Sequence, residues 1–298
     1  MTGLPEHQPV MPAEVIAFLS PSRGGLFVDC TTGLGGHTLL LLEQGAERVI
    51  GLDRDADALR IAAERLAAFS DRVELVHSDY RHLARVLDAR SISGVNGVLA
   101  DLGVSSMQLD ADGRGFTFRR SEPLDMRMDR STGPTLAELL DKVEEEDLAN
   151  VIFQFGEERH SRRIARSIVR GRESGRIETT GELADLVRRA VPKRGYQRID
   201  PATRTFQALR IWVNRELEGL DAFLADTSRR LLAGARLAVI TFHLLEDRIV
   251  KHTFRAIAAA SDAWHVLTRK PVVAGDDEIA RNPRARSAKL RVPALGGR

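Results

Sequence analysis

Short apolar runs alternate with helical patterns along the first hundred residues. Between the runs, residues 54–69 place Leu59, Ala62 and Leu66 at the spacing of one helical face. Each run carries an aspartate at or near its carboxyl end, and we predict strands over residues 25–29, 48–53, 72–79 and 95–103. Strands separated by helices of this length predict parallel βαβ units, with helices on both faces of one sheet.

The pattern changes after residue 105. Helical patterns cover residues 135–155, 158–172, 179–191 and 203–217, and strand patterns return at 236–242, 264–270 and 288–292. The sequence therefore predicts an α/β domain with a doubly wound sheet, formed by residues 1–105 and 206–298. A helical domain is inserted at residues 106–205. We expect the least ordered parts at 1–8, 109–130 and 274–285.

A glycine-rich turn, DCTTGLGGHT, follows the first predicted strand at residues 29–38. The dinucleotide fingerprint needs glycine at its first, third and sixth positions. Gly33 and Gly35 fill the first two, but Thr38 stands at the sixth. Asp53 ends the second strand, where an acid accepts hydrogen bonds from ribose hydroxyls. A ligand with ribose but without pyrophosphate points to S-adenosylmethionine.

Four predicted strands end in aspartates: Asp29, Asp53, Asp79 and Asp101. Ligands of open α/β sheets bind at the carboxyl ends of the strands, so a row of acids there favours a site. Asp is also common at helix caps, which is the structural alternative. Tyr80 offers a ring to an adenine or is a half-buried aromatic, and a neutral His37 is expected near the cofactor.

The charge is unevenly distributed along the chain. The net charge is only +2, but residues 156–215 carry 15 Lys and Arg against 7 Asp and Glu, and residues 279–298 carry 6 against none. Such local excess predicts a site for a polyanion or, alternatively, an ordinary solvated surface. The single cysteine, Cys30, excludes an intrachain disulfide. With no signal-peptide or membrane-spanning pattern, we expect a cytoplasmic protein.

Nine motifs run in the order found in one bacterial family. They are HQPVM (7–11), DCTTGLGGHT (29–38), DLGVSSMQLD (101–110), RGFTF (114–118), PLDMRMD (123–129), FGEER (155–159), PATRTFQALRIWVN (201–214), FHLLEDRIVK (242–251) and NPRARSAKLR (282–291). Over nearly its whole length, the chain resembles the MraW-like, S-adenosylmethionine-dependent methyltransferases that modify cytosine N4 in small-subunit (16S) ribosomal RNA near the decoding site. Leu244 stands where that family usually has Ser.

The resemblance implies a class I methyltransferase (Rossmann-like) sheet of seven strands with a helical insertion. It also implies cofactor contacts from Gly35, Gly36, His37, Asp53, Tyr80, Asp101 and Gln108, and we add Gly33 as the first glycine of the turn. No metal is expected. For the chemistry, Asp101 is the candidate acceptor for the target amine, with the hydroxyls of Ser105 and Ser106 nearby. The fourth strand end lacks an aromatic, so Phe116 or Phe118 is the candidate for stacking on the base.

Arginines of the predicted insertion are the candidates for RNA contact. Arg163, Arg166 and Arg170 follow helical spacing and continue a stripe from Arg159. Arg204, Arg210, Lys193, Arg194 and Arg198 add charge, although Arg210 could equally pair with an acid of the protein. The expected partner is the small ribosomal subunit, and the sequence allows a homodimer. Two other classes compete: a nicotinamide-dependent oxidoreductase and a non-catalytic ribosome assembly factor.

Overall fold

The computed structural model describes residues 8–192 and 199–296 and divides the chain into two units. The first comprises Met1–Gly103 and Leu217–Arg298, and the second comprises Val104–Glu216. The predicted return to the α/β domain at residue 206 is wrong, because it would cut the helix α10 (Ala202–Asn214), which belongs entirely to the second unit.

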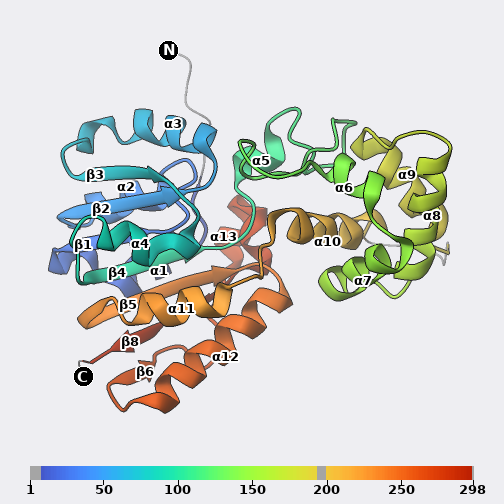
Figure 1. Ribbon diagram of the computed structural model, residues 1–298. Coiled ribbons are helices and arrows are strands. Elements are labelled where there is room, and N and C mark those ends of the chain that lie inside the picture. Colours follow the sequence, from blue (N-terminus) through green and yellow to red (C-terminus); the bar gives the residue numbers. More distant parts are fainter. Residues whose placement is uncertain (1–7, 193–198, 297–298) are drawn as a thin grey trace. The chain divides into compact units, whose positions relative to one another are not determined.

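The first unit contains one mixed sheet. Its strands are β1 (Leu26–Asp29), β2 (Arg48–Asp53), β3 (Val73–His77), β4 (Val95–Asp101), β5 (Leu231–Thr241), β6 (Trp264–Val266), β7 (Lys289–Arg291) and β8 (Pro293–Leu295). Figure 1 shows the order β3-β2-β1-β4-β5-β8-β6. The strand β7 also pairs with β5. Strands β1 to β5 pair in parallel, and the last three segments are antiparallel to their neighbours. Only Val292 separates β7 from β8, so eight segments stand where the resemblance implied seven strands.

Helices cover both faces of this sheet, as predicted. The strand β4 alternates: Leu99 packs in one apolar cluster, and its neighbours Val98 and Ala100 pack in the other. The cluster around Leu99 receives side chains from α1 (Pro12–Leu19), α2 (Gly36–Glu43), α3 (Ala56–Arg65) and α13 (Asp276–Arg281). The opposite cluster receives them from α4 (Leu83–Asp88), α11 (Leu220–Ser228) and α12 (Leu244–Ala260). The doubly wound arrangement is therefore confirmed.

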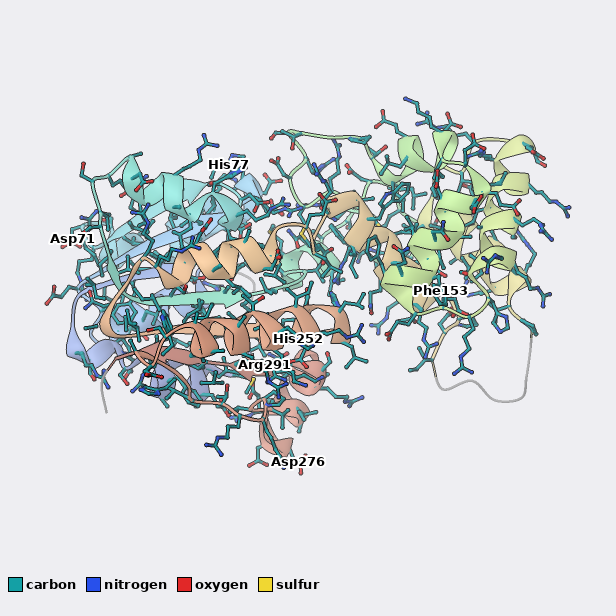
Figure 2. All side chains as sticks on the ribbon, turned by 60° about the horizontal axis from the view of Figure 1, so that its bottom comes forward. Asp71, His77, Phe153, His252, Asp276 and Arg291 are labelled. Atoms are coloured by element: carbon teal, nitrogen blue, oxygen red, sulfur yellow. The ribbon has the colours of Figure 1, made fainter. Side chains whose placement is uncertain are left out.

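The antiparallel end of the sheet is tied to α12 by charge. Arg291 of β7 is buried and donates through Nε to Asp247 Oδ1 at 2.7 Å, and it lies beside α12 in Figure 2. Lys289 Nζ lies 3.5 Å from the other oxygen of Asp247. Part of the basic C-terminal segment therefore has a structural role.

The described part of the second unit contains six helices: α5 (Ser106–Asp110), α6 (Leu136–Lys142), α7 (Glu145–Gly156), α8 (Ser161–Glu173), α9 (Thr180–Ala190) and α10. The predicted helix over 135–155 is in fact two, because the backbone becomes extended at Val143. The guanidinium of Arg172 donates to the carbonyls of Leu140 and Val143, both at 2.6 Å, which satisfies groups that end α6. Thr179 and Glu182 form a capping box at the start of α9.

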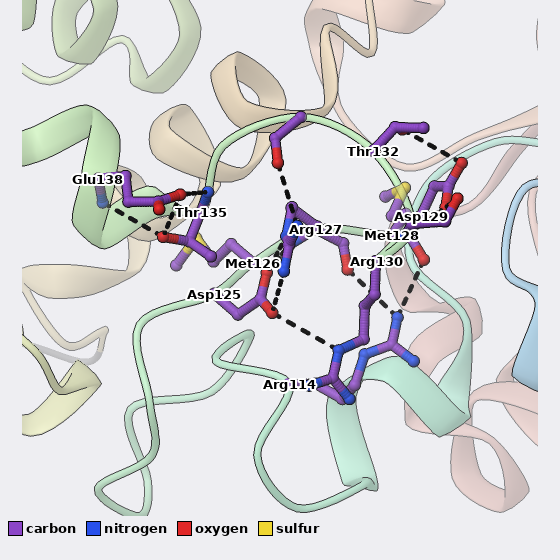
Figure 3. A network of polar contacts seen from close by, with 12 residues as sticks. Arg114, Asp125, Met126, Arg127, Met128, Asp129, Arg130, Thr132, Thr135 and Glu138 are labelled. Carbon is purple, nitrogen blue, oxygen red and sulfur yellow. Dashed lines mark hydrogen bonds and ion pairs between the residues drawn. The ribbon is translucent and has the colours of Figure 1, made fainter.

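The segment 109–130 has little regular structure, but polar contacts fix it, contrary to expectation. Arg127 pairs with Asp125 through Nε and Nη2, and Arg114 donates to the carbonyls of Arg127 and Met128 (Figure 3). Asn214 accepts from the Met128 amide at 2.8 Å. The predicted irregular stretch at 274–285 contains α13 and a short 3-10 helix, η4 (Pro283–Ser287). Residues 1–7 lie outside the described part.

Candidate functional site

Three aspartates end adjacent parallel strands, as the sequence predicted. Asp29 closes β1, Asp53 closes β2 and Asp101 closes β4, and β1 lies between the other two strands. Asp79 departs from the prediction, because β3 ends at His77 and Asp79 instead caps the short helix η3 (Tyr80–His82) by accepting from the Arg81 amide. Carboxyl ends of parallel strands meet at one edge, so this edge is the candidate site.

The glycine turn lies against the end of β2. Gly33 and Gly35 have φ values of 52° and 81°, in the left-handed region that favours glycine. The Gly33 amide donates to Asp53 Oδ2 at 2.7 Å, and α2 begins at Gly36. A Cβ on Gly35 would also meet Leu66 Cδ1 at 3.2 Å. The turn therefore has little freedom, and it is joined to Asp53 across 20 residues of sequence.

A fully buried carboxylate connects three elements of the edge. Asp29 Oδ2 accepts from the Thr38 hydroxyl at 2.7 Å, and Oδ1 accepts from the Thr31 amide at 3.1 Å. The Thr31 hydroxyl in turn accepts from the Asp101 amide at 2.6 Å. Burial raises the pKa of Asp29, although nearby His37 and these hydrogen bonds act against the rise. Thr38, at the position where the dinucleotide fingerprint requires glycine, thus holds the start of α2 to β1.

His37 and Asp101 form the least satisfied part of the edge. Their closest charged atoms, His37 Nε2 and Asp101 Oδ2, lie 3.6 Å apart. Among the residues that the structure describes, both ring nitrogens of His37 and Oδ1 of Asp101 are buried without a hydrogen-bond partner. Most buried polar atoms in proteins are hydrogen-bonded, so each exception calls for an explanation. A bound polar ligand with donors and acceptors would supply these partners.

Asp53 combines burial with two backbone donors. Its carboxylate accepts from the amides of Gly33 and Asp55, at 2.7 and 2.8 Å. Burial raises its pKa to about 6 despite these two hydrogen bonds. Each carboxylate oxygen has two lone pairs, so Asp53 retains capacity to accept from ligand hydroxyls when it is ionised.

Tyr80 packs as an aromatic of the core edge. Its ring meets that of Phe223 edge-on, with centroids 4.7 Å apart. Burial raises the pKa of the Tyr80 hydroxyl. For Asp79, burial acts to raise the pKa, but the hydrogen bonds and charge of Arg81 outweigh it and hold the pKa below its ordinary value. These contacts agree with the structural alternative for Tyr80 and leave its adenine contact a prediction.

Three further predicted residues, Ser105, Ser106 and Gln108, belong to the second unit. Ser105 Oγ accepts from the Gln108 amide at 3.2 Å, and Gln108 Oε1 accepts from the Ser105 amide at 3.0 Å, which forms the capping box of α5. The side chain of Ser106 lies outside the described part. The roles of these residues toward an edge formed by the first unit remain predictions.

The two aromatics proposed for stacking are engaged elsewhere. Phe116 is buried, and Phe118 meets Phe206 edge-on with centroids 4.7 Å apart. Phe118 packs against the core of the second unit. Arg114 lies over the Phe116 ring and Arg188 over the Phe118 ring, with 6.0 and 5.7 Å from Cζ to the ring centroids, so these contacts disfavour stacking of either ring on a base.

The arginines separate into two groups. Arg163, Arg166 and Arg170 are exposed on α8, opposite its buried Ile164 and Ile168, and Arg204 is exposed on α10. Arg166 Nε contacts Glu145 at 3.3 Å. Arg210 differs, because its guanidinium makes two 2.9 Å hydrogen bonds to buried Glu216. This contact agrees with the alternative that Arg210 pairs with an acid of the protein. Lys193, Arg194 and Arg198 lie outside the described residues.

Within residues 8–192 and 199–296, none of the helices has the length and apolarity needed to cross a bilayer. The same part of the chain holds Cys30 as a buried, free thiol, and burial raises its pKa well above the ordinary value.

Comparisons with known proteins give one consistent result. The model of the MraW methylase family matches residues 5–294. A protein of Sorangium cellulosum named ribosomal RNA small subunit methyltransferase H is 52% identical, covering 96% of this chain and 90% of its own. Proteins of the same name from Geobacter sp. strain M21 and Bradyrhizobium diazoefficiens are 46% and 48% identical, each over 96% of this chain and over 97% and 90% of their own.

Proposed function

Because this chain belongs to the MraW methylase family, we propose that it transfers a methyl group from S-adenosylmethionine to the exocyclic N4 amine of a cytidine in small-subunit (16S) ribosomal RNA, near the decoding site. The relatives named as small-subunit ribosomal RNA methyltransferases support the RNA class. The choice of N4 and of the decoding site rests on the motifs shared with that family. The first unit has the class I methyltransferase fold, as predicted.

One observation carries the proposal of a ligand at this edge. His37 and Asp101 keep three buried polar atoms without hydrogen bonds, beside a glycine turn that is fixed to Asp53. An edge with only a structural role would have these atoms paired within the protein. The donor set fits the cofactor, which carries ribose hydroxyls, an amine and a carboxylate.

Each residue of the edge is proposed to contact a different part of S-adenosylmethionine. Gly33, Gly35 and Gly36 let the main chain approach it, and ionised Asp53 accepts from the ribose hydroxyls. The buried ring of His37 forms hydrogen bonds with polar groups of the cofactor. The cofactor supplies an electrophilic methyl group on a sulfonium. Tyr80 and Gln108 complete the proposed contacts.

The chemistry requires alignment more than activation. The lone pair of N4 attacks the methyl carbon, a C–N bond forms, the C–S bond breaks and S-adenosylhomocysteine leaves. The amine loses one proton in the process, and this proton passes to water. Asp101 accepts a hydrogen bond from the amine, which fixes its lone pair toward the methyl group. Ser105 and Ser106 are proposed as neighbouring hydroxyls.

The second unit is proposed to bind the RNA. Arg163, Arg166, Arg170 and Arg204 present exposed charge, and phosphate contacts of this kind position RNA without reading its sequence. Arg210 contributes through its ion pair with Glu216 to the structure of the unit instead. The substrate is the small ribosomal subunit, and the reaction takes place in the cytoplasm. The methylase match leaves no support for the nicotinamide-dependent alternative.

The direct test uses S-adenosylmethionine labelled on its methyl group and small subunits that lack the modification. We expect label in the 16S RNA and, after digestion to nucleosides, in N4-methylcytidine. Label in another nucleoside would correct the target atom. No transfer by a protein that binds S-adenosylmethionine would favour the non-catalytic assembly factor.

A further inference from the structure

We propose that Phe242, which follows β5, provides the aromatic face against which the target base packs. The inference rests on the proposed function and names a residue that contacts its substrate. The motif FHLLEDR, which begins at Phe242, has no role in the cofactor contacts described above. The end of β4 offers an acceptor but no ring, and Phe116 and Phe118 pack inside the second unit.

Phe242 and Asp101 lie on the same face of the sheet. Strands β4 and β5 pair in parallel, with Asp101 opposite Ile240. Leu99 and Ile240 are buried in the same apolar cluster, and Phe242 packs at its margin. Because side chains alternate along a strand, Asp101 and Phe242 each lie two residues beyond a member of that cluster, on its side. The two residues therefore lie near one another at the carboxyl edge of the sheet.

The backbone beside the ring is kept free of side chains. Gly103, two residues after Asp101, has a φ of 108°, which strains any other residue. A Cβ at this position would touch Phe242 Cδ2 at 3.4 Å. Glycine at 103 therefore leaves the flank of the ring open at the carboxyl edge.

A buried carboxylate fixes the position of Phe242. Glu246 is 2% exposed, and its Oε2 accepts from the Phe242 amide at 3.0 Å. Its other oxygen, Oε1, lies 3.0 Å from His243 Nε2. The Leu102 amide donates to the Ile240 carbonyl at 2.9 Å, which holds the end of β4 to β5. The ring is partly buried, so one side packs on the core and the remainder is accessible.

A second apolar residue follows shortly after Phe242 in the sequence. Leu244, the first residue of α12, is 55% exposed. An exposed leucine and a partly exposed phenylalanine within one short segment offer apolar surface, which suits the flat, weakly polar face of a base rather than a phosphate. We therefore place the base, and not the RNA backbone, at this position.

The experiment compares Phe242→Leu with Phe242→Tyr in methyl transfer to small subunits lacking the modification. Leucine keeps apolar volume but removes the ring, whereas tyrosine keeps the ring. Loss of base stacking is expected to lower kcat/KM for the subunit by at least about tenfold in Phe242→Leu. Phe242→Tyr should stay within about threefold of wild type, and the affinity for S-adenosylmethionine should be unchanged in both. Phe18→Leu, which alters a partly buried ring of α1 in the same apolar cluster, is the matched control.

The outcomes separate this inference from the function it rests on. Failure of the wild-type protein to methylate any small subunit would overturn the proposed function itself. With an active wild type, full activity of Phe242→Leu would overturn the stacking role. Equal losses in the leucine and tyrosine variants, or a parallel loss of cofactor affinity, would show a structural role and overturn it as well.

Discussion

The two units bury charged and polar groups in different ways. In the first unit, His37 and Asp101 keep polar atoms without hydrogen bonds at the carboxyl edge of the sheet. In the loop of the second unit, Asp125 is also buried, but Arg127 binds both of its oxygens and Arg130 lies 3.5 Å away. Both regions combine buried charge with left-handed backbone, at Gly35 in one and Met126 in the other. The two carboxylates therefore differ in pairing: Asp125 is bound at both oxygens by Arg127, whereas Oδ1 of Asp101 has no hydrogen-bond partner among the described residues.

The largest effect on stability is expected from a substitution that breaks the ion pair between Asp125 and Arg127. Asp125→Asn leaves Arg127 without its anionic partner, and removing one member of a buried pair costs about 3 kcal/mol. The free energy of unfolding, measured by chemical denaturation at pH 7, should fall by this amount. The exposed pair of Asp226 and Arg229 gives the control, since Asp226→Asn should change stability by less than about 0.5 kcal/mol.

The pH dependence sharpens the same prediction. Burial acts to raise the pKa of Asp125, but its hydrogen bonds to Arg127 outweigh this and lower the pKa. A lowered carboxyl pKa stabilises the fold above the ordinary pKa, and that stabilisation is lost as the pH falls through the lowered value. The difference between wild type and Asp125→Asn should therefore shrink at low pH, and a constant difference would contradict the ion-pair explanation.

The second prediction concerns the unpaired region. In Asp101→Asn, one buried oxygen that has no hydrogen bond is replaced by an amide group of the same shape, so stability should hardly change. We expect kcat at saturating S-adenosylmethionine to fall by about 100-fold, with a much smaller change in cofactor affinity, because the amine loses its negatively charged acceptor in the transition state. Asp71→Asn, at an exposed turn, is the charge control. Near-normal turnover would refute a catalytic role for Asp101.

The third prediction tests Asp53 as the ribose acceptor. Asp53→Ala should weaken binding of S-adenosylmethionine by about 1–3 kcal/mol through unpaired hydroxyls. The pKa of about 6 means that the wild-type protein should lose affinity as the pH falls from 7.5 to 5, and Asp53→Asn should not share this dependence. Calorimetry across this pH range measures the affinity for S-adenosylmethionine. Equal affinities of wild type and folded variants would contradict the ribose assignment.

Asp53 should affect stability with the opposite sign to Asp125. Its folded pKa is raised above the unfolded value, so its stabilising contribution is complete below about pH 4 and is lost as the pH rises through about 6. Asp53→Asn should therefore gain stability relative to wild type between pH 4 and 7. The gain is limited to roughly 1.4 kcal/mol for each unit of pKa shift. Thermal unfolding of the ligand-free proteins measures it.

The smallest effect is expected from the exposed arginines. Replacing Arg163, Arg166 and Arg170 with Gln should weaken subunit binding by roughly tenfold and flatten its salt dependence, because fewer phosphates are neutralised. Cofactor affinity should not change. Three exposed arginines of the first unit, Arg60, Arg229 and Arg255, give a control of equal charge. If the dependence of subunit affinity on salt concentration did not change, the α8 arginines would be ordinary solvated surface residues.

The strand ends could be predicted where the apolar run and the observed strand end at the same residue. The aspartates of β1, β2 and β4 stand at the strand ends as expected, whereas β3 ends two residues early because Asp79 turns to cap η3. The long helix α12 was not predicted. Its N-cap is His243, which accepts from the Glu246 amide at 3.4 Å, and histidine is not among the residues that usually signal a helix start.

The chemistry of the edge could be predicted only in part. Residue types and their order along the chain indicated Asp53, His37 and Asp101. The bond from Gly33 to Asp53 and the unsatisfied atoms of His37 depend on contacts between distant segments, which no local pattern encodes. The same limit applies to Arg210, since its pairing with Glu216 is visible only in the fold.

Asp29 has a consequence for how this protein can be changed. Its carboxylate touches the turn and α2, and through Thr31 it reaches the backbone of Asp101. Substitutions at 29 and 38 remove the two partners of one buried hydrogen bond, so their effects should not add, in contrast to those of distant sites. A substitution at Asp29 should therefore shift both the glycine turn and, through Thr31, the end of β4.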